Sequence, residues 1–520
     1  MTRSIGQGQE PIRLGIDFGT TRSAVALVDR GNYPLVHFQA PDGDMKDWYP
    51  TLAAVRGLER CYGWDAWDKQ TEPGWSVLRS FKRLLGQASP QTPIRFGEQE
   101  MPVGELLAGF LGRLRCDLLE RSNLSCQPDT TFEVTVGVPA HSNSNQRFLT
   151  LDAYRRAGFR VRAMMSEPSA AGIEYAHRYR MRNAGGGREY IIIYDLGGGT
   201  FDASIVRMTE RHHEVVTSEG IAHLGGDDFD EILAHLALGR AARYEFTDQE
   251  TFLLLEECRE KKESLHPNTR KITLDLSRAV AGGEEITLPV AEFYEHCQPL
   301  VEETCKALEA ALGRIHPGQE EPDWRQVAAV YLVGGATDLP VVGRVLREWY
   351  GRRVRKSPYP RAATAIGLAI ASDDAAGFAV QEGFTRHFGV WREADSGNRI
   401  VFDPIFRKDT PLPRPGEEPL THRRTYHPVH NIGHLRYLEC GRLRADGSPA
   451  GEIVPWEEIF FPYDASLASS PAMSAVEVRS EEALPGPLIE EVYRCDSDGI
   501  VTVEIVNHTM GYQRNYRLRE

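Results

Sequence analysis

The stretch Tyr190-Ile-Ile-Ile-Tyr-Asp-Leu-Gly-Gly-Gly-Thr-Phe-Asp202 decides the fold of this chain. It starts with an apolar run of β-branched and aromatic residues and continues directly into a glycine-rich turn. A short apolar run bounded by glycine is typical of a buried strand. Two other runs have the same form, namely Leu14-Gly-Ile16 before Asp17 and Val330-Tyr-Leu-Val333 before Gly334-Gly335. The sequence therefore predicts buried strands at all three places.

Helical patterns lie between these runs. Apolar residues recur there at three- and four-residue spacing, which indicates amphipathic helices over residues 103–119, 145–157, 227–243 and 252–265. Since strands and helices alternate, this part of the chain is predicted to be α/β. The segment Ile16-Asp-Phe-Gly-Thr-Thr-Arg-Ser23 repeats the order strand, Asp, Gly and Thr of the first stretch. This internal echo predicts two structurally similar lobes.

The pattern changes from about Gly383 onward. Short extended segments at residues 399–405, 435–443, 476–478 and 501–506 alternate with turn signals such as Asp446-Gly447 and Asp498-Gly499. The recurring Val, Ile, Phe, Tyr and Trp give this part apolar surface to bury, which a disordered tail lacks. We expect a second, all-β domain, a sandwich. The predicted domains are residues 1–380 and 384–520.

Composition excludes several classes of protein. The chain has 520 residues, 41% of them hydrophobic and 26% charged, as in ordinary folded proteins. A net charge of −14 argues against nucleic acid as the main partner. The eight cysteines form no C-x-x-C pair, and neither an apolar leader nor a membrane-spanning run occurs. We expect a cytoplasmic protein without a membrane partner.

The two echoed turns carry the chemistry. Glycine lets backbone N–H groups approach an oxyanion and threonine hydroxyls add donors, so such a turn can cradle phosphate. The adjacent carboxylates, Asp17 and Asp195, suit Mg²⁺, which keeps several waters and takes few protein ligands. A lone Asp-x-Gly fits an ordinary β-hairpin turn as well. Two copies plus the Gly334-Gly335 strand end favour nucleotide binding, and a P-loop is absent because no Gly-Lys-Ser/Thr occurs.

These residues resemble the actin, sugar-kinase and heat-shock-70 superfamily, and specifically its DnaK-type chaperones. The matching strings are Ile16-Asp-Phe-Gly-Thr-Thr21, Phe81-Lys-Arg-Leu-Leu-Gly86, Val138-Pro-Ala140 with Asn145-Gln-Arg147, Glu167-Pro-Ser-Ala-Ala-Gly172, Asp195 to Asp202, His223-Leu-Gly-Gly-Asp-Asp-Phe-Asp230 and Val333-Gly-Gly-Ala-Thr337. The resemblance implies a duplicated actin-like ATPase fold, with two ribonuclease-H-like lobes, followed by a β-sandwich. It also implies a chaperone that hydrolyses ATP slowly to ADP and phosphate and binds extended apolar polypeptide.

Roles for individual residues follow from the resemblance. The implied catalytic residues are Asp17, Lys82, Glu167, Asp195 and Thr200. The implied phosphate-binding residues are Gly19, Thr20, Thr21, Gly197, Gly198, Gly199 and Thr200. The implied adenosine-binding residues are Gly225, Gly226, Lys262, Gly334, Gly335 and Asp338. Mg²⁺ would be held, largely through water, by Asp17, Asp195 and Asp202, and an interdomain relay would comprise Pro139, Arg147 and Glu167. For Lys82 alone, a solvated helix lysine is the alternative.

The sequence departs from the family pattern at the adenosine pocket. Arg259 and Glu263 stand where the family has a glutamate and an arginine, and Ala336 and Asp338 replace its serine and arginine. Arg361 replaces an aspartate. A guanidinium that stacks on adenine is therefore absent. We hypothesise that charges are swapped in pairs, with Asp338 facing Arg259 or Arg361, which would weaken or alter base selectivity.

The linker and the C-terminus also depart. Residues 379–388 lack the family's acidic residue and leucine run, which puts interdomain coupling in question, and the chain stops at Glu520 where the family continues into a helical lid. We expect a lidless chaperone that releases peptide fast, with a J-domain co-chaperone and a nucleotide-exchange factor as partners. A nucleotide-gated interaction module with little turnover and a dedicated protein partner is the alternative. A small-molecule kinase would not explain the sandwich.

Two weaker signals remain. His422, His427, His430 and His434 lie near Cys440, but their spacing matches no closed zinc site. The basic run Arg352-Arg-Val-Arg-Lys356 is interpreted as a solvated helix end rather than a nucleic-acid contact.

Overall fold

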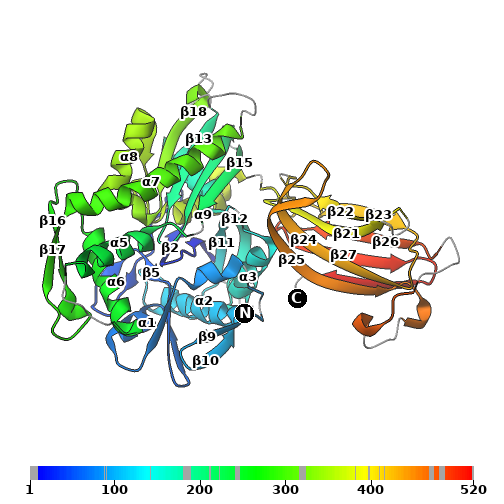
Figure 1. Ribbon diagram of the computed structural model, residues 1–520, viewed down its shortest axis with the longest axis horizontal. Helices are drawn as coiled ribbons and strands as arrows, with labels where there is room; N and C mark the ends of the chain where they lie inside the picture. Colours follow the sequence, from blue (N-terminus) through cyan, green and yellow to red (C-terminus); the bar gives the residue numbers. More distant parts are fainter. Residues whose placement is uncertain are drawn as a thin grey trace, which may run out of the picture. The chain divides into compact units, whose positions relative to one another are not determined.

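The computed structural model describes residues 10–86, 88–89, 91–140, 142–179, 189–209, 212–221, 223–240, 246–315, 324–380, 382–395, 399–408, 410–414, 416–467, 473–479 and 486–517. The chain divides into two compact units. The first unit comprises Met1–Leu84, Pro90–Ala140 and Leu151–Val380, and the second comprises Leu85–Ser89, His141–Thr150 and Gln381–Glu520. Figure 1 labels their helices and strands.

The first unit contains a sheet with the described strand order β12-β11-β1-β2-β5. Its strands are β1 (Ile12–Asp17), β2 (Arg22–Leu27), β5 (Tyr49–Pro50), β11 (Phe132–Val138) and β12 (Arg160–Ser166). Strand β1 pairs antiparallel with β2 and parallel with β11. The turn between β1 and β2 therefore lies at the same sheet edge as the ends of β11 and β12.

A second sheet repeats this arrangement, with the order β19-β18-β13-β14-β15-β20. Its strands are β13 (Tyr190–Leu196), β14 (Phe201–Thr209), β15 (His212–Ile221), β18 (Val327–Val333), β19 (Val354–Lys356) and β20 (Ala379–Val380). Strand β13 pairs antiparallel with β14 and parallel with β18. The two lobes predicted from the echo are confirmed, and so are the three buried strands.

Alternating side chains of β13 bury both faces of this second sheet. Ile192 and Tyr194 belong to one apolar cluster, which includes residues of α5, α7 and α8, whereas Ile191 and Ile193 belong to another, with residues of α4 and α9. Figure 1 shows α7 lying across β14 and β15. A strand that is buried on both faces has to be apolar at nearly every position, which explains its sequence.

The helices match the predicted patterns closely. They are α1 (Trp64–Asp68), α2 (Val103–Glu120), α3 (Ser144–Arg156), α4 (Glu167–Tyr179), α5 (Gly226–Leu238), α6 (Asp248–Glu263), α7 (Val290–Gly313), α8 (Pro340–Tyr350) and α9 (Ala363–Ser372). The helix expected over residues 227–243 ends at Leu238, and residues 241–243 lie outside the described part of the chain. Helix α6 begins at the capping box of Thr247 and Glu250, which explains its early start.

Helix α9 packs unusually closely against its neighbours. A Cβ atom at Gly15 of β1 would collide with the backbone of Ala365 and Ala369, and one at Gly367 would collide with the Ala170 carbonyl of α4. Only glycine leaves room for such backbone contacts. Helix α9 therefore joins the first sheet to the helix layer beneath the second.

Smaller elements complete the first unit. They are β3 (Phe38–Gln39), β4 (Met45–Lys46), β6 (Leu52–Arg56), β7 (Glu59–Tyr62), β8 (Ser76–Arg79), β9 (Pro93–Phe96), β10 (Gln99–Pro102), β16 (Lys271–Asp275), β17 (Glu285–Pro289) and the 3₁₀ helix η2 (Phe81–Gly86). Strands β6, β7 and β8 form one small sheet, and η2 follows β8 directly.

The second unit contains two antiparallel sheets, with the orders β22-β21-β24-β25 and β23-β26-β27-β28. The strands are β21 (His387–Ala394), β22 (Arg399–Phe406), β23 (Leu420–Tyr426), β24 (Ile432–Leu443), β25 (Pro449–Pro462), β26 (Ile489–Cys495), β27 (Val501–Asn507) and β28 (Tyr512–Arg517). One apolar cluster contains Phe388 and Val390 of the first sheet and Tyr493 and Val503 of the second. This β-sheet-rich region agrees with the predicted all-β fold.

One predicted strand of this region is wrong. Residues 476–478 form no strand, because they follow the 3₁₀ turn Met473–Ala475 and lie beside Asn431 rather than along a sheet edge. Asn431 donates to the carbonyl of Glu477 over 3.1 Å and accepts from the N–H of Arg479 over 2.7 Å. Side-chain hydrogen bonds thus take the place of a ladder.

A charged cluster lies inside the second unit. Glu491 is fully buried. It accepts hydrogen bonds from Arg392 Nη2 over 2.6 Å and from the hydroxyl of Tyr426, also over 2.6 Å. Arg392 also donates to Asp403 over 2.8 Å. Burial alone would raise the pKa of Glu491, but the Arg392 charge and these donors hold it below its usual value. The interior is therefore polar at this place.

Candidate functional site

The two echoed turns are hairpin turns that meet. One connects β1 to β2, and the other connects β13 to β14, where the Gly197 N–H donates to the Thr200 carbonyl over 3.0 Å. The hairpin interpretation of Asp-x-Gly is thus correct locally. A Cβ atom at Gly198 would nevertheless collide with the Thr21 hydroxyl, so the two turns face each other at contact distance. Glycine at position 198 thus leaves room for the Thr21 side chain.

Two further glycine strings join them. The Gly226 N–H donates to the Gly197 carbonyl over 2.9 Å, at the N-terminus of α5. Gly334 has a φ of 85° and lies so close to Asp195 that a Cβ atom would collide with its carboxylate. The structure therefore brings together the predicted strings around Thr21, Gly197, Gly226 and Gly334.

Lys82 and Glu167 form a buried ion pair beside these turns. The Lys82 Nζ lies 2.7 Å from Glu167 Oε1, and their side chains are 10% and 15% exposed. Lys82 comes from η2, and Glu167 is the first residue of α4, directly after β12. Burial alone would lower the pKa of Lys82, but the charges of Glu167 and Asp17 raise it. The alternative of a solvated helix lysine does not hold.

The strand-end aspartates are half-buried close to this pair. Burial and the Glu167 charge raise the pKa of Asp17 and of Asp195 to about 7 each. Burial, together with the Asp195 charge, raises the pKa of Asp202 well above its usual value. Asp195 and Asp202 pair directly across the β13–β14 hairpin. Lys82 lowers the pKa of these carboxylates, but its single charge does not offset burial and their mutual repulsion.

The donor set fits a hydrated Mg²⁺ ion. Asp17, Asp195 and Asp202 supply oxygen ligands, and the buried Thr21 Oγ1 has no hydrogen-bond partner. In the part of the chain that the structure describes, no three carboxylate, His or Cys side chains are arranged to hold a metal directly. Mg²⁺ commonly keeps several waters between itself and carboxylates, so an indirect set of this kind suits it.

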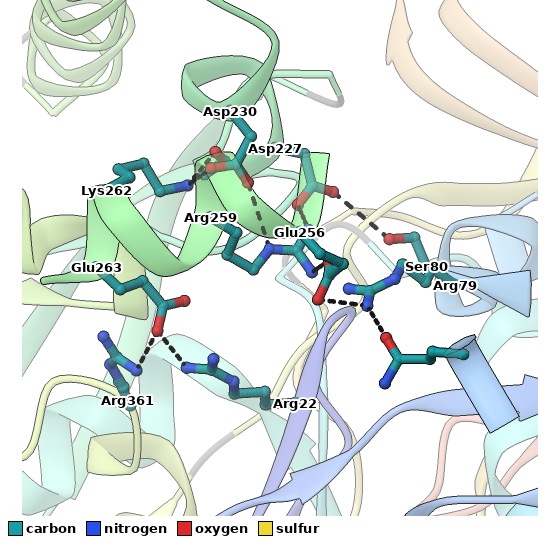
Figure 2. A network of polar contacts seen from close by, with 12 residues as sticks. Arg22, Arg79, Ser80, Asp227, Asp230, Glu256, Arg259, Lys262, Glu263 and Arg361 are labelled. Atoms are coloured by element: carbon teal, nitrogen blue, oxygen red, sulfur yellow. Dashed lines mark hydrogen bonds and ion pairs between the residues drawn. The ribbon is translucent and has the colours of Figure 1, made fainter. Parts of the chain in front are cut away.

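At the expected adenosine site, the cationic side chains of helix α6 form ion pairs with carboxylates of helix α5 (Figure 2). Lys262 Nζ lies 2.6 Å from Asp230 and also donates to the Gly226 carbonyl. Arg259 donates to Asp227 over 2.9 Å and to Asp230 over 3.3 Å. Gly225 is the N-cap residue of α5 and donates its N–H to the Asp228 carboxylate over 2.7 Å. These cations are held in place without a ligand.

Figure 2 shows Glu263 between two arginines. Glu263 Oε2 lies 2.9 Å from Arg22 Nη1 and 3.1 Å from Arg361 Nη1. Arg361 Nε in turn donates to Asp338 over 3.0 Å. Asp338 thus faces Arg361, one of the two partners expected from the charge swap, and not Arg259. Gly335 lies against the Arg361 side chain.

Sequence analysis missed several members of this network. Arg22 lies 4.3 Å from the Trp48 ring centroid, and Arg79 lies 2.7 Å from Glu256. Arg22 directly follows the Thr21 turn, and that position could have signalled its role. Arg79 and Glu256 are far apart in sequence and belong to no glycine string, so only the fold brings them together.

The relay residues fall into different units. Pro139 follows β11 and Glu167 follows β12, and these parallel strands pair up to Val138 and Ser166, so the two residues are neighbours in the first unit. Arg147 belongs to the second unit, where its Nε donates to the Asp498 carbonyl over 2.9 Å.

The second unit has a groove of about 370 Å³ along the edge strands β22 and β23. Its lining combines apolar and charged side chains: Asp403, Pro404, Ile405, Phe406, Arg407, Thr410, Leu420, Thr421, His422 and Arg424. Edge strands carry main-chain groups without a partner strand, so an extended segment can pair there.

Other expected features are placed as follows. His430 pairs with Glu393 over 2.8 Å and His434 with Glu458 over 2.6 Å, each with a separate carboxylate. All eight cysteines are unpaired. No helix within the described ranges is both long enough and apolar enough to cross a membrane.

Comparison with known proteins agrees with this geometry. The family model described as Hsp70 protein matches residues 13–383. The chain is 32% identical over 392 residues to the "Chaperone protein HscA homolog" of Variovorax paradoxus (strain S110), covering 72% of this chain and 60% of that protein. It is 31% identical over 385 residues to the "Chaperone protein HscA" of Pectobacterium carotovorum subsp. carotovorum (strain PC1), covering 70% and 58%.

These matches span less than two thirds of the relatives' length. The range matched by the family model includes the strings around Asp17, Lys82, Glu167, Asp195 and Gly334, which the fold brings together. Since the family model matches well over half of the residues, the chain belongs to the Hsp70 family.

Proposed function

We propose that the chain hydrolyses ATP to ADP and phosphate and binds extended polypeptide, as a chaperone of the DnaK type. The observation that carries this proposal is the buried Lys82–Glu167 pair beside the carboxylates of Asp17 and Asp195. Domains over residues 1–380 and 384–520 would carry the two activities.

The first unit's residues suit phosphoryl transfer to water, which needs positioning and charge neutralisation. Lys82, kept charged by its carboxylate neighbours, would neutralise the transferring phosphoryl group. Glu167 would orient the attacking water through its second oxygen, with Thr200 nearby. A bound Mg²⁺ would supply positive charge to the phosphate oxygens.

The glycine turns would hold the phosphates. Gly19, Thr20 and Thr21 would bind one phosphate and the turn from Gly197 to Gly199 the next, through backbone N–H groups. The Thr21 hydroxyl oxygen, which is buried and has no hydrogen-bond partner, supports this assignment. Asp17, Asp195 and Asp202 would take the metal's waters.

The adenosine end would lie along the glycine strings and the ion-pair network. The residues assigned to it are Gly225, Gly226, Lys262, Gly334, Gly335 and Asp338. Because Lys262 and Asp338 pair with Asp230 and Arg361, we propose weaker base selectivity than the family pattern gives.

The second unit would bind the polypeptide. The groove along β22 and β23 has apolar lining residues and strand edges without a partner strand among the described residues, to which an extended peptide can add by main-chain hydrogen bonds. Its charged lining, including Arg407 and Arg424, suits clients of mixed character. The relay of Pro139, Arg147 and Glu167, a J-domain co-chaperone, an exchange factor and a cytoplasmic location are part of the same proposal.

A second candidate is a nucleotide-gated interaction module with little turnover and one dedicated partner. The pairing of Glu263 with Arg22 and Arg361 favours it, because these side chains hold one another rather than standing free for a base.

Steady-state ATP hydrolysis of the full chain tests the proposal, with and without an unfolded apolar peptide. Turnover that rises with peptide and falls in Lys82→Ala supports a coupled chaperone. Tight nucleotide binding without turnover or peptide response supports the interaction module. Phosphate release without an added hydroxyl acceptor rules out a small-molecule kinase.

A further inference from the structure

The basic run Arg352 to Lys356 is not a solvated helix end. It occupies the short 3₁₀ turn Gly351–Arg353 and strand β19 (Val354–Lys356). Strand β19 pairs with β18 on one side and is the outermost described strand of its sheet. Its other side therefore presents main-chain N–H and C=O groups without a partner strand in the described part of the chain.

The arginines of this run have no carboxylate partner among the described residues. Arg352, Arg353 and Arg355 are exposed, and no carboxylate among the described residues pairs with any of them. Lys356 differs, because its Nζ lies 2.6 Å from Asp338. Three guanidinium groups without a described carboxylate partner thus form a concentrated positive patch at this end of the strand, on a chain whose net charge is −14.

Aromatic rings hold two of these guanidinium groups in place. The Arg355 guanidinium lies 5.0 Å from the ring centroid of Tyr179, and that of Arg353 lies 5.7 Å from the ring of Trp324. A guanidinium over a ring loses side-chain freedom but keeps its N–H groups available to a carboxylate. It also covers the ring face on which a nucleic-acid base would stack. The arrangement therefore favours carboxylates over bases.

The same sheet already accepts a short extended segment at its opposite edge. Strand β20 (Ala379–Val380) pairs in parallel with β15 there, and it contributes only two residues. A brief main-chain ladder to a segment of the same chain thus already occurs on this sheet. Strand β19 offers a ladder of similar length.

We propose that the β19 edge, defined by β19 with Arg352, Arg353 and Arg355, binds an extended acidic segment of a partner polypeptide. The segment would add as a strand, and its carboxylates would pair with the exposed guanidinium groups. Main-chain hydrogen bonds would provide the docking, and the arginine–carboxylate pairs the selectivity. This partner site is distinct from the nucleotide turns and from the groove in the second unit.

Binding of a fluorescein-labelled octapeptide of alternating Glu and Val to the full chain tests this proposal. Fluorescence anisotropy is expected to show saturable binding, and at least about twentyfold weaker binding of a Lys-Val peptide. The variant R352E/R353E/R355E should lose at least about twentyfold in affinity. The control R95E/R156E/R270E, which reverses three exposed arginines elsewhere, should stay within about twofold. Equal losses in both variants would overturn the proposal.

Two N-methylated peptides test the strand geometry. In an added strand only alternate N–H groups point at β19, so methylation of either the Val or the Glu nitrogens should abolish binding while the other set is tolerated. Binding of both methylated peptides would overturn strand addition. Oligouridine of equal charge should bind more weakly than the Glu-Val peptide, and tighter binding would assign the edge to single-stranded nucleic acid instead. Unchanged circular dichroism confirms that the variants fold.

Discussion

Asp338 accepts a hydrogen bond from Arg361 Nε over 3.0 Å, and the Lys356 Nζ lies 2.6 Å from its other oxygen. The carboxylate is therefore saturated by cations of its own chain. A paired side chain must break its ion pair before it can contact a nucleobase. The new contact therefore adds little net binding free energy.

Base selectivity should accordingly be weak. The full chain is expected to bind ADP and GDP with dissociation constants within about tenfold, which is about 1.4 kcal/mol. Competition calorimetry would measure the ratio. Arg361→Ala, which leaves Asp338 with Lys356 as its remaining partner, should shift the ratio by more than Arg355→Ala, whose side chain lies outside this network. A preference for ADP above a hundredfold would contradict the prediction.

Removal of the Lys82 ammonium should stop turnover while nucleotide still binds. Lys82→Ala leaves Asp17, Glu167 and Asp195 without their buried cation, so kcat is expected to fall by at least about a hundredfold. Phosphate release in single-turnover conditions would measure it. Lys271→Ala, at an exposed strand position, is the control and should match the wild type. Turnover retained in Lys82→Ala would remove this residue from the chemistry.

The sequence was sufficient to predict the parts of the site that depend on local pattern. Apolar runs before Asp17 and Asp195 specify strands, and glycine specifies turns, so these positions are predictable from a few residues. The pairing of Arg79 with Glu256 was not predictable, since two charged residues on separate elements carry no register until the lobes fold. The strand predicted at residues 476–478 was wrong for a different reason. Asn431 forms hydrogen bonds with this segment, and β-propensity does not describe such side-chain contacts.

The buried ion pair of the second unit should be strongly coupled. Glu491→Leu leaves Arg392 partly unpaired in the interior and is expected to cost about 3 kcal/mol of unfolding free energy. In a double-mutant cycle with Arg392→Met, the coupling should exceed about 2 kcal/mol by urea denaturation. The adjacent pair Arg423–Glu490, 2.8 Å apart with an exposed arginine, is the matched control and should couple by less than about 1 kcal/mol. Equal coupling of both pairs would refute the prediction.

The free energy of unfolding of the α5–α6 region should decrease as pH rises, because Asp230 loses its proton. Burial raises its pKa to about 6, although Lys262 and Arg259 oppose this rise. With a folded pKa above the unfolded value, the folded state holds the extra proton, so its stabilising contribution is present at low pH and is lost as pH rises through about 6. Between pH 5 and pH 7 the loss is about 1.4 kcal/mol. Amide hydrogen exchange of α5, corrected for intrinsic rates, should show it in the wild type and not in Asp230→Asn.

Gly367→Ala should destabilise the first unit. The added methyl group would collide with the Ala170 carbonyl, and two helix backbones must separate to admit it, at a cost of about 3 kcal/mol. Gly112→Ala in α2 is the matched control, because open space surrounds that position and alanine favours helix by about 0.5–1 kcal/mol. The midpoint temperature of thermal unfolding should therefore fall in Gly367→Ala and rise in Gly112→Ala.

The same contact has a mechanical consequence. Large interdigitated side chains must leave their holes before two packed elements can turn past each other. At Gly15, Gly367 and Ala170, backbone meets backbone, so no protruding side chain has to be lifted out. At these positions the contact of α9 with β1 and α4 therefore does not depend on the interlocking of side chains.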